Sequence, residues 1–403
     1  MCLLKKLIAM AVILGLCFNM AVSAKTVSSE SDISDINEPL STSVSSSAIG
    51  QKLDIKAKSV ILMEPNTKKI LYEDNADEKL SPASITKIMS LLLVMEAIDR
   101  GEFDLETVVT ASKHACSMGG SQIWLEENES MTVDDLLKAT VIASANDACV
   151  CLGEFIAGSE EGFVALMNER AKELGMNNTT FKNCTGLDAE GHLTSAYDVA
   201  VMSSELIKHD LIKNYSTVWM DSLRNGESEL VNTNKLVRFY KGTTGLKTGT
   251  TSIAKYCLSA TAERDNLELV AVVMAGETSN DRFEGAKKLL DYGFANYSFE
   301  KIEAKLDKNS IPIEKGVKKE IEIKAEEALN LLLPKINKAD IKQVVEIKEN
   351  ITAPVKKGDI LGTVKIYSGE TEVGSIKIVA NETVKKLDLA QIIRFIVNGI
   401  FKL

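Results

Sequence analysis

The sequence predicts a mixed α/β domain, followed by a small antiparallel β domain and an amphipathic terminal helix. Helical patterns come first, strand patterns follow them, and apolar and charged residues alternate with a period of two after Tyr297. The helical stretches are 84–95, 133–150 and 161–174, and the clearest strands are 256–262 and 267–275. With 403 residues, 45% of them apolar, the chain is long enough for two domains.

Residues 1–24 have the pattern of an export signal. Lys5 and Lys6 precede an apolar run from Leu7 to Leu16, and Ala24 follows the small residues that a signal peptidase requires. A lipoprotein signal at Cys17 is the alternative, although Leu16 stands where a small residue is expected. Residues 25–50 are rich in Ser, Asp and Glu and predict a flexible leader. No other stretch reaches the ~20 apolar residues of a spanning helix, so we expect an exported protein peripheral to the outer face of the cytoplasmic membrane.

Charge and cysteine content exclude two classes of partner or site. The formal net charge is -10, and -12 without Lys5 and Lys6, which disfavours a nucleic-acid partner. Five cysteines remain after the signal, without repeated spacing, and an odd number argues against a disulfide framework. A metal site at Cys149 and Cys151 would need a second cysteine pair or a nearby histidine, and the sequence has neither, so we expect small buried core residues there. The sequence predicts no metal site and no cofactor.

Residues 51–296 form the predicted first folded domain. Two strand patterns, 59–63 and 68–72, flank Glu64-Pro65-Asn66-Thr67 and predict a hairpin. After Pro82 the helical stretch is apolar on nearly every side, so it belongs inside the domain. Turns are expected at Gly119-Gly120, Asn177-Asn178 and Gly186, and a helix over 281–292 closes the domain.

Residues 297–382 predict the all-β domain. Apolar and charged residues alternate at 319–323, 344–347 and 375–379, and Gly358 and Gly369 mark turns. This region contains no plausible catalytic cluster.

Residues 383–403 predict an amphipathic helix that lies on a membrane surface. If 384–403 is helical, one face carries Leu389, Ile392, Ile393, Ile396 and Ile400, and the opposite face carries Gln391, Arg394, Asn398 and Lys402. Four basic residues against Asp388 give this tip a side-chain charge of +3, which favours an interfacial anchor. The alternative is a terminal helix packed on the β domain, but Phe395 and Phe401 widen the apolar face beyond that need.

Three short strings carry the chemistry: Ser84-Ile85-Thr86-Lys87, Ser144-Ala145-Asn146 and Lys247-Thr248-Gly249-Thr250. A serine needs a base, and a lysine three positions later on a helix lies within reach of it. That lysine must be neutral near pH 7, which burial and the charge of Lys247 would favour. Each string alone could be a helix start, a cap or a turn. Their order, with gaps of 60 and 103 residues, makes the joint signal specific.

With these strings the chain resembles the low-molecular-mass penicillin-binding proteins of the serine D-alanyl-D-alanine carboxypeptidase family, especially their spore-former members. The resemblance covers nearly everything after the leader. The matching segments are 82–87, 143–148, 232–236, 245–249 and 353–358.

The resemblance implies a penicillin-recognising transpeptidase/β-lactamase-like fold, with an antiparallel sheet flanked by helices beside a helical lobe. Ser84 would attack the carbonyl between the terminal D-alanines of a peptidoglycan stem peptide, with Lys87 as general base. Ser144 and Asn146 would relay protons and hold the substrate amide. Lys247 would contribute positive potential, and Thr248, Thr250 and Arg282 would bind the terminal carboxylate. Gly249 completes the implied substrate-binding set, and the Ser84 and Thr250 backbone N–H groups would form the oxyanion hole. β-Lactams would acylate the same serine.

One departure, one open alternative at Arg282 and two rival functions accompany this resemblance. Many relatives carry His where this chain has Thr250, and Arg282 could instead be a surface charge at a helix start. His114, His192 and His209 are scattered, and we expect His192 to support structure. A class A-like β-lactamase would need Glu-x-x-Leu-Asn between the second and third strings, which is absent. A non-catalytic wall-associated binding protein would not need the intact set of catalytic residue types.

Overall fold

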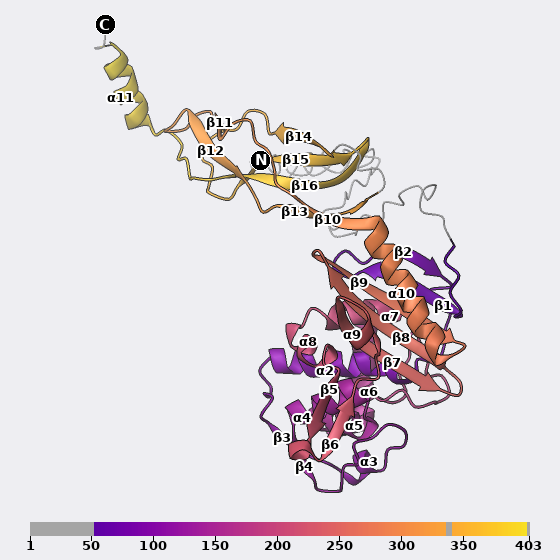
Figure 1. The fold of residues 1–403 in the computed structure, drawn as a ribbon. Coiled ribbons are helices and arrows are strands. Elements are labelled where there is room, and N and C mark those ends of the chain that lie inside the picture. The colour runs from indigo at the N-terminus through magenta and orange to yellow at the C-terminus, as the bar shows by residue number, and fades with distance from the viewer. Residues whose placement is uncertain (1–51, 336–340, 401–403) are drawn as a thin grey trace, which may run out of the picture. The chain divides into compact units, whose positions relative to one another are not determined.

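The computed structural model describes residues 52–335 and 341–400 (Figure 1). The predicted export signal and leader lie outside the described residues. Within this described part, no helix is both long enough and apolar enough to cross a bilayer.

A five-stranded antiparallel sheet forms the centre of the first domain, in the order β2-β1-β9-β8-β7 (Figure 1). The strands are β1 Ser59–Glu64, β2 Lys69–Asp74, β7 Thr243–Thr251, β8 Lys255–Arg264 and β9 Leu267–Gly276. The predicted hairpin and the predicted strands over 256–262 and 267–275 are therefore confirmed. β7, which carries the third string, is the last strand of the sheet.

Helices cover both faces of this sheet. Gly293 of α10 (Ser279–Asn296) lies against Leu62, whereas Ser204 of α7 (Ala196–Leu206) donates to Met63 Sδ at 3.8 Å. Successive side chains of a strand point to opposite faces, so α10 and α7 pack on opposite sides of β1. The predicted arrangement of a sheet flanked by helices is confirmed.

A helical lobe lies beside the sheet and holds the first two strings. Its helices are α2 Lys87–Asp99, α3 Lys113–Cys116, α4 Val133–Lys138, α5 Asn146–Ala157, α6 Glu160–Glu173, α8 Lys213–Ser216 and α9 Leu236–Phe239. Two hairpins, β3 Val108–Thr110 with β4 Ser130–Thr132 and β5 Met220–Leu223 with β6 Ser228–Val231, complete it, together with the short helical turns η1 Ala83–Thr86, η2 Ala139–Ala143, η3 Asp210–Ile212 and η4 Arg224–Gly226. As predicted, α2 is apolar and buried on nearly all sides.

The helical stretch predicted over 133–150 is interrupted. α4 ends at Lys138, a π-helical turn follows, and Ser144 takes a left-handed backbone with φ 63° before α5 starts. Hydrophobic periodicity could not detect this break, because Ile142, Ala145 and Ala148 on both sides of it are all fully buried. The break places the second string at the start of α5 instead of inside a helix.

The second domain is all β, as predicted. Its strands are β10 Tyr297–Ile302, β11 Ser310–Pro312, β12 Glu320–Ala325, β13 Leu329–Pro334, β14 Ile341–Ile347, β15 Ile360–Ser368 and β16 Thr371–Ala380. β10 pairs with β13, and the other strands form an antiparallel sheet in the order β11-β12-β16-β15-β14. In β12, Ile321 and Ile323 are buried while Glu320 and Glu322 are exposed, which is the period-two pattern of the sequence.

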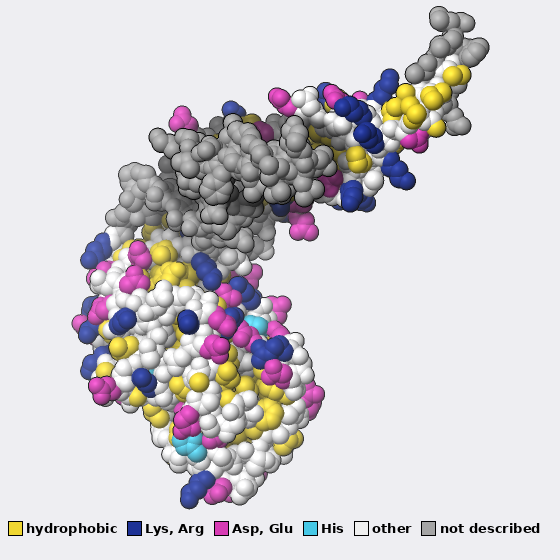
Figure 2. Space-filling view, turned by 180° about the vertical axis from the view of Figure 1, so that it is seen from behind, with side chains coloured by type: hydrophobic (Ala, Val, Ile, Leu, Met, Phe, Trp, Pro, Cys, Tyr) yellow, Lys and Arg dark blue, Asp and Glu magenta, His cyan; other side chains and the backbone are white. Residues whose placement is uncertain are grey.

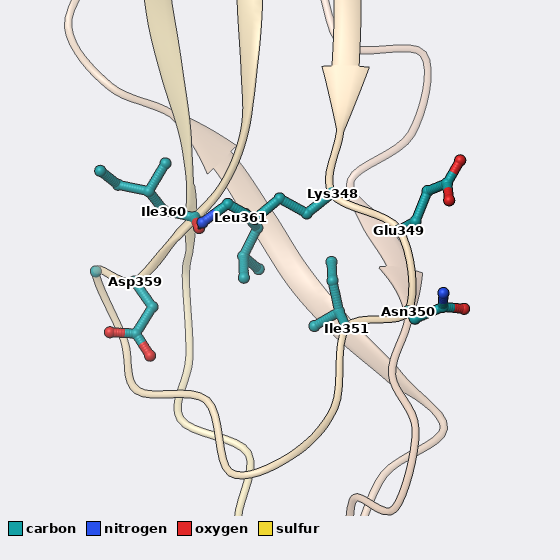
Figure 3. Close-up of a pocket in the computed structure, with 8 residues that line it drawn as sticks. Lys348, Glu349, Asn350, Ile351, Asp359, Ile360 and Leu361 are labelled. Atoms are coloured by element: carbon teal, nitrogen blue, oxygen red, sulfur yellow. The ribbon is translucent and has the colours of Figure 1, made fainter. Parts of the chain in front are cut away.

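A pocket of about 680 Å³ lies in this β domain, between residues 348–351 and 358–361 (Figure 3). Inside it, Lys348 Nζ donates to the Ile360 carbonyl at 2.7 Å, whereas the side chains of Glu349 and Asn350 point outward. None of the predicted site residues lines this pocket.

The terminal helix begins later than predicted. α11 spans Leu389–Ile400, whereas Val384 is fully buried and bridged to Val355, and Lys386 is bridged to Gly316. Val384 fills the β core, so the chain remains part of the β domain through Lys386. In the described part of α11, apolar side chains are exposed at Leu389, Ile392, Ile393 and Val397 (Figure 2).

Candidate active site

The first string lies between two close backbone contacts. Ser84 is half-buried in η1, immediately before α2. A Cβ added to Gly186 would lie 1.8 Å from the Ala83 carbonyl oxygen, and one added to Gly249 would lie 2.8 Å from the Pro82 carbonyl oxygen. Only glycine permits these approaches. The Ser84 backbone is therefore fixed between the 183–188 segment and the third string on β7.

Lys87 joins the first string to the second. Its side chain is fully buried, and Nζ lies 3.1 Å from Ser84 Oγ, 2.6 Å from Asn146 Oδ1 and 2.8 Å from the Thr185 carbonyl oxygen. The amide and carbonyl oxygens can only accept, so they take the two N–H bonds of a neutral amine and leave its lone pair for the Ser84 hydroxyl. Burial lowers the pKa of Lys87, which favours this neutral form.

The orientation of the Asn146 amide is fixed by its other partner. Asn146 Nδ2 donates to the Gly119 carbonyl at 2.6 Å, and the Asn146 backbone N–H donates to the Ser121 carbonyl at 2.7 Å. Because a carbonyl cannot donate, the amide nitrogen must face Gly119 and Oδ1 must face Lys87.

Asp147, the residue after Asn146, holds the 121–125 segment by hydrogen bonds to its backbone. Its buried carboxylate accepts the backbone N–H groups of Ile123, Leu125 and Ala148 at 2.9 to 3.2 Å. Its negative charge raises the pKa of Lys87, as Cys149 and Cys184 also do, but the lowering by burial is the larger effect. Asp147 directly follows Asn146 within the matching segment 143–148, but its residue type and position carry no sequence signal for this role.

Ser144 presents a hydroxyl that no described residue binds. Its left-handed backbone lies at the turn between η2 and α5, and the residue is only 4% exposed. Within the described residues, Ser144 Oγ makes no hydrogen bond, so it retains its donor and both acceptor positions.

The third string supplies a second buried amine. Lys247 is 1% exposed, and its Nζ donates to the Thr248 carbonyl at 3.3 Å. Burial, followed by the positive charges of Lys87 and Arg282, lowers the pKa of Lys247 well below its ordinary value. Thr248 Oγ1 donates to Thr233 Oγ1 at 2.8 Å, which ties β7 to the 232–234 segment.

Arg282 belongs to the site, and its interpretation as a surface charge is wrong. It is 8% exposed on α10, and Nη1 donates to Thr250 Oγ1 at 2.8 Å and to the Gly249 carbonyl at 3.0 Å. Its Nε is buried without a hydrogen-bond partner, and within the described residues the guanidinium forms no ion pair. Burial of a cation with no carboxylate beside it among the described residues is costly, and an anion at this position would offset that cost.

The histidines and cysteines take structural positions. His192 lies 2.9 Å from Thr86 Oγ1 and accepts the Lys182 backbone N–H at 3.1 Å, and burial lowers its pKa to about 4. A neutral ring thus supports η1 without reaching Ser84. Cysteines 116, 149, 151, 184 and 257 are free thiols, and all but Cys116 are buried. Among the residues that the structure describes, no group of three or more His, Cys, Asp or Glu could hold a metal ion.

Comparison with known proteins identifies the family. Residues 44–278 match the D-alanyl-D-alanine carboxypeptidase family, and residues 299–386 match the C-terminal domain of penicillin-binding protein 5. The chain belongs to the D-alanyl-D-alanine carboxypeptidase family. Members of this family are serine hydrolases of cell-wall peptides, which decides against the rival β-lactamase and non-catalytic functions.

Relatives cover both domains. The chain is 44% identical to D-alanyl-D-alanine carboxypeptidase DacF of Bacillus subtilis, over 82% of this chain and 86% of that relative. Penicillin-binding protein 5 of Haemophilus influenzae is similar in structure, with a TM-score of 0.71 and 30% identity over 83% of this chain and 99% of that one. Ampicillin-bound penicillin-binding protein D2 of Listeria monocytogenes matches with a TM-score of 0.56 and 31% identity over 60% of this chain and all of that one.

The three strings lie together in the structure, as the sequence predicted, but the backbone groups that orient their side chains were not predicted. The carbonyls of Gly119 and Thr185 fix Asn146 and Lys87, and no side-chain motif reports a carbonyl. Their only sequence signal was the adjacent glycine turns at Gly119-Gly120 and Gly186.

Proposed function

We propose that the enzyme removes the terminal D-alanine of peptidoglycan stem peptides through an acyl-enzyme on Ser84. Ser84 Oγ attacks the carbonyl carbon between the two D-alanines, and the peptide C–N bond breaks to release free D-alanine. Water then hydrolyses the ester and frees the shortened peptide. The half-buried Ser84 hydroxyl, 3.1 Å from a buried amine, supports this assignment.

Lys87 is the general base in this proposal, and the observation that carries it is the set of three contacts at Nζ. Asn146 Oδ1 and the Thr185 carbonyl occupy both N–H bonds of the neutral amine, so its lone pair receives the Ser84 proton. The proton then returns to the leaving nitrogen through the Ser144 hydroxyl, whose hydrogen-bonding capacity is unused by the described residues.

The third string and Arg282 bind the terminal carboxylate. Lys247 and Arg282 lie in the interior without an ion pair among the described residues. The Thr248 and Thr250 hydroxyls lie on β7, the strand that carries Lys247, and Thr250 Oγ1 contacts Arg282. An incoming carboxylate favours the charged form of Lys247 and so offsets the lowering of its pKa by burial. Backbone N–H groups of Ser84 and Thr250 form the oxyanion hole, and the contact of Gly249 with η1 supports this pairing.

A direct test combines D-alanine release with penicillin labelling. The wild-type enzyme should release D-alanine from a pentapeptide ending in D-Ala-D-Ala and should take up fluorescent penicillin covalently. Ser84→Ala should lose both activities, while Ser252→Ala, an exposed serine next to the third string, should retain both. Persistent labelling of the Ser84→Ala enzyme would reject this nucleophile.

We further propose that the mature enzyme is exported and held at the outer face of the cytoplasmic membrane by α11. Residues 1–24 act as the export signal, 25–50 as the leader, 51–296 as the catalytic domain and 297–386 as the β domain. Exposed apolar residues such as Ile392 and Ile393, on a helix that follows Lys385 and Lys386, support interfacial binding.

Deleting residues 389–403 should move the enzyme to the soluble fraction while its carboxypeptidase activity is retained. Ile393→Asp should weaken membrane binding, whereas Gln391→Asp adds the same charge on the predicted polar face and should weaken it less. Retention of the truncated enzyme on membranes would reject the anchor.

A further inference from the structure

Two buried thiols lie next to the residues that hold Lys87 in place. Cys149 is on α5, three residues after Asn146, and Cys184 directly precedes Thr185. Both cysteines are at most 1% exposed. Residues three apart on a helix are neighbours, so Cys149 and Asn146 lie on the same side of α5. The proposed acyl-enzyme mechanism uses neither thiol.

The two thiols interact with each other. Cys149 Sγ donates to the Cys184 carbonyl at 3.3 Å, and a side-chain hydrogen bond between the thiols lowers the pKa of Cys149 and raises that of Cys184. Ser90 Oγ, on α2 one turn after Lys87, donates to the same carbonyl at 2.7 Å. The thiol pair therefore lies where α2, α5 and the 183–188 segment meet.

Cys184 also has an acid–base partner that connects it to the surface. Glu160 Oε1 accepts the Cys184 backbone N–H at 3.1 Å, and Cys184 Sγ donates to the same oxygen at 3.4 Å. Glu160 Oε2 lies 2.7 Å from Nε2 of His114, which is exposed. The Glu160 carboxylate can therefore take the proton of the Cys184 thiol and pass it to a leaving group.

We propose that hydrogen peroxide oxidises Cys149 and Cys184 to a disulfide, and that this modification switches the active site off. The inference rests on the proposed acyl-enzyme function and on the proposed export, because outside the cytoplasm no thiol pool keeps cysteines reduced. It adds redox control to the same site. Peroxide is small enough to reach buried sulfur during local opening of the fold.

The oxidation takes place in two steps. The Cys149 sulfur attacks one peroxide oxygen, the O–O bond breaks, and hydroxide leaves as water with the thiol proton, which makes a sulfenic acid. The Cys184 sulfur then attacks the Cys149 sulfur, the S–O bond breaks, and the hydroxyl leaves as water with the Cys184 proton, which Glu160 delivers. The two sulfur atoms lose two electrons in total, and one peroxide is reduced to two waters.

The disulfide disturbs both groups that orient Lys87. A covalent S–S bond is shorter than any contact between separate thiols, and in a close-packed interior the backbone must move to allow it. Asn146 Oδ1 and the Thr185 carbonyl then shift relative to Lys87 Nζ, so the lone pair of the amine no longer points at the Ser84 hydroxyl. A misplacement of about 1 Å costs on the order of 100-fold in rate.

Peptide mapping and acylation by fluorescent penicillin test the proposal together. The enzyme is treated with hydrogen peroxide and digested with trypsin, and the digest is analysed by mass spectrometry with and without dithiothreitol. Trypsin cleaves after Lys and Arg, which places Cys149 in peptide 139–170 and Cys184 in peptide 183–208. A disulfide links these two peptides and lowers their summed mass by two hydrogens.

The oxidised wild type should contain the linked peptides, acylate about 100-fold more slowly than the reduced wild type, and recover in dithiothreitol. Cys149→Ser should lack the link, although Cys151 remains in the same peptide. Cys184→Ser should also lack the link and should keep its acylation rate through the same treatment. The control Cys116→Ser removes the most accessible of the described thiols and should respond as the wild type does.

Three results would overturn the redox switch alone. They are the absence of linked peptides from the oxidised wild type, an unchanged acylation rate in spite of the link, and an equal loss of rate in Cys184→Ser. Failure of the reduced wild type to take up penicillin would instead overturn the proposed function.

Discussion

Gly186→Ala provides a severe test of how the Ser84 backbone is held. Gly186 has φ +89°, and an added Cβ would lie 1.8 Å from the Ala83 carbonyl oxygen and 2.8 Å from the Ser84 nitrogen. Real Cβ atoms keep at least 3.0 Å from such neighbours, so Ala83 must move by about 1.2 Å. Both neighbours are backbone atoms, and they cannot rotate away as a side chain would.

The expected effects are a slower reaction and a less stable fold. A misplacement of about 1 Å costs on the order of 100-fold in rate, so acylation by fluorescent penicillin should slow by about that factor. The left-handed backbone costs an alanine about 1 kcal/mol and the overpacking about 2 kcal/mol more, so urea unfolding should show a loss of about 3 kcal/mol.

Gly158→Ala is the matched control for backbone strain. Gly158 has φ +79°, but an added Cβ would meet nothing within 4 Å. This variant should lose about 1 kcal/mol of stability and acylate at the wild-type rate. If Gly186→Ala acylates as fast as Gly158→Ala, the contact with Ala83 does not position the nucleophile and the reasoning is wrong.

Two further predictions concern pH. Asn146→Asp would place a negative charge where Oδ1 lies 2.6 Å from Lys87 Nζ, and this charge would raise the pKa of Lys87. The acidic limb of the kcat/KM profile, measured by stopped-flow acylation, should therefore move to higher pH. A limb that does not move would argue against Lys87 as the base. His192 has a pKa of about 4 in the fold against about 6.5 in the unfolded chain, so the unfolded state binds the extra proton between these values and stability falls as pH is lowered through that window. The free energy of unfolding, measured by urea titration, should fall by on the order of 3 kcal/mol across this window. In His192→Gln the free energy of unfolding should depend less on pH. Equal pH dependence in both proteins would contradict a neutral buried ring.

The pattern of apolar side chains correctly predicted strands with one buried face and the helix that is buried on nearly all sides. The alternation of Ile321 and Ile323 with glutamates gave the correct β domain, and the apolar run after Pro82 gave a buried α2. It failed at Ser144 and Val384, where the residues stay buried although the backbone changes direction. The pattern of apolar residues indicates which side chains are buried. At a left-handed residue or an isolated bridge the backbone changes direction while the side chains stay buried, so the pattern does not show the change.

The candidate site could be predicted as a set of side chains but not as a geometry. Ser84, Lys87 and Asn146 were identifiable from residue type and spacing, since each must supply a particular chemical group. The partners that set the orientation of Lys87 and Asn146 are the Thr185 and Gly119 carbonyls, contributed by loops of unpatterned sequence. Every residue has a backbone carbonyl, so sequence cannot indicate which one a lysine will meet.

The buried guanidinium of Arg282 has a consequence for how the enzyme behaves in solution. A buried cation whose Nε has no hydrogen-bond partner among the described residues makes the free protein less stable than its packing alone would allow. We therefore expect small carboxylic acids to raise the melting temperature of this fold, by mass action on the folded form. Under the proposed function we expect the same molecules to compete with the peptide substrate, so acetate should stabilise the stored enzyme and slow it in an assay. The liberated D-alanine also carries a carboxylate, and we expect it to inhibit turnover weakly.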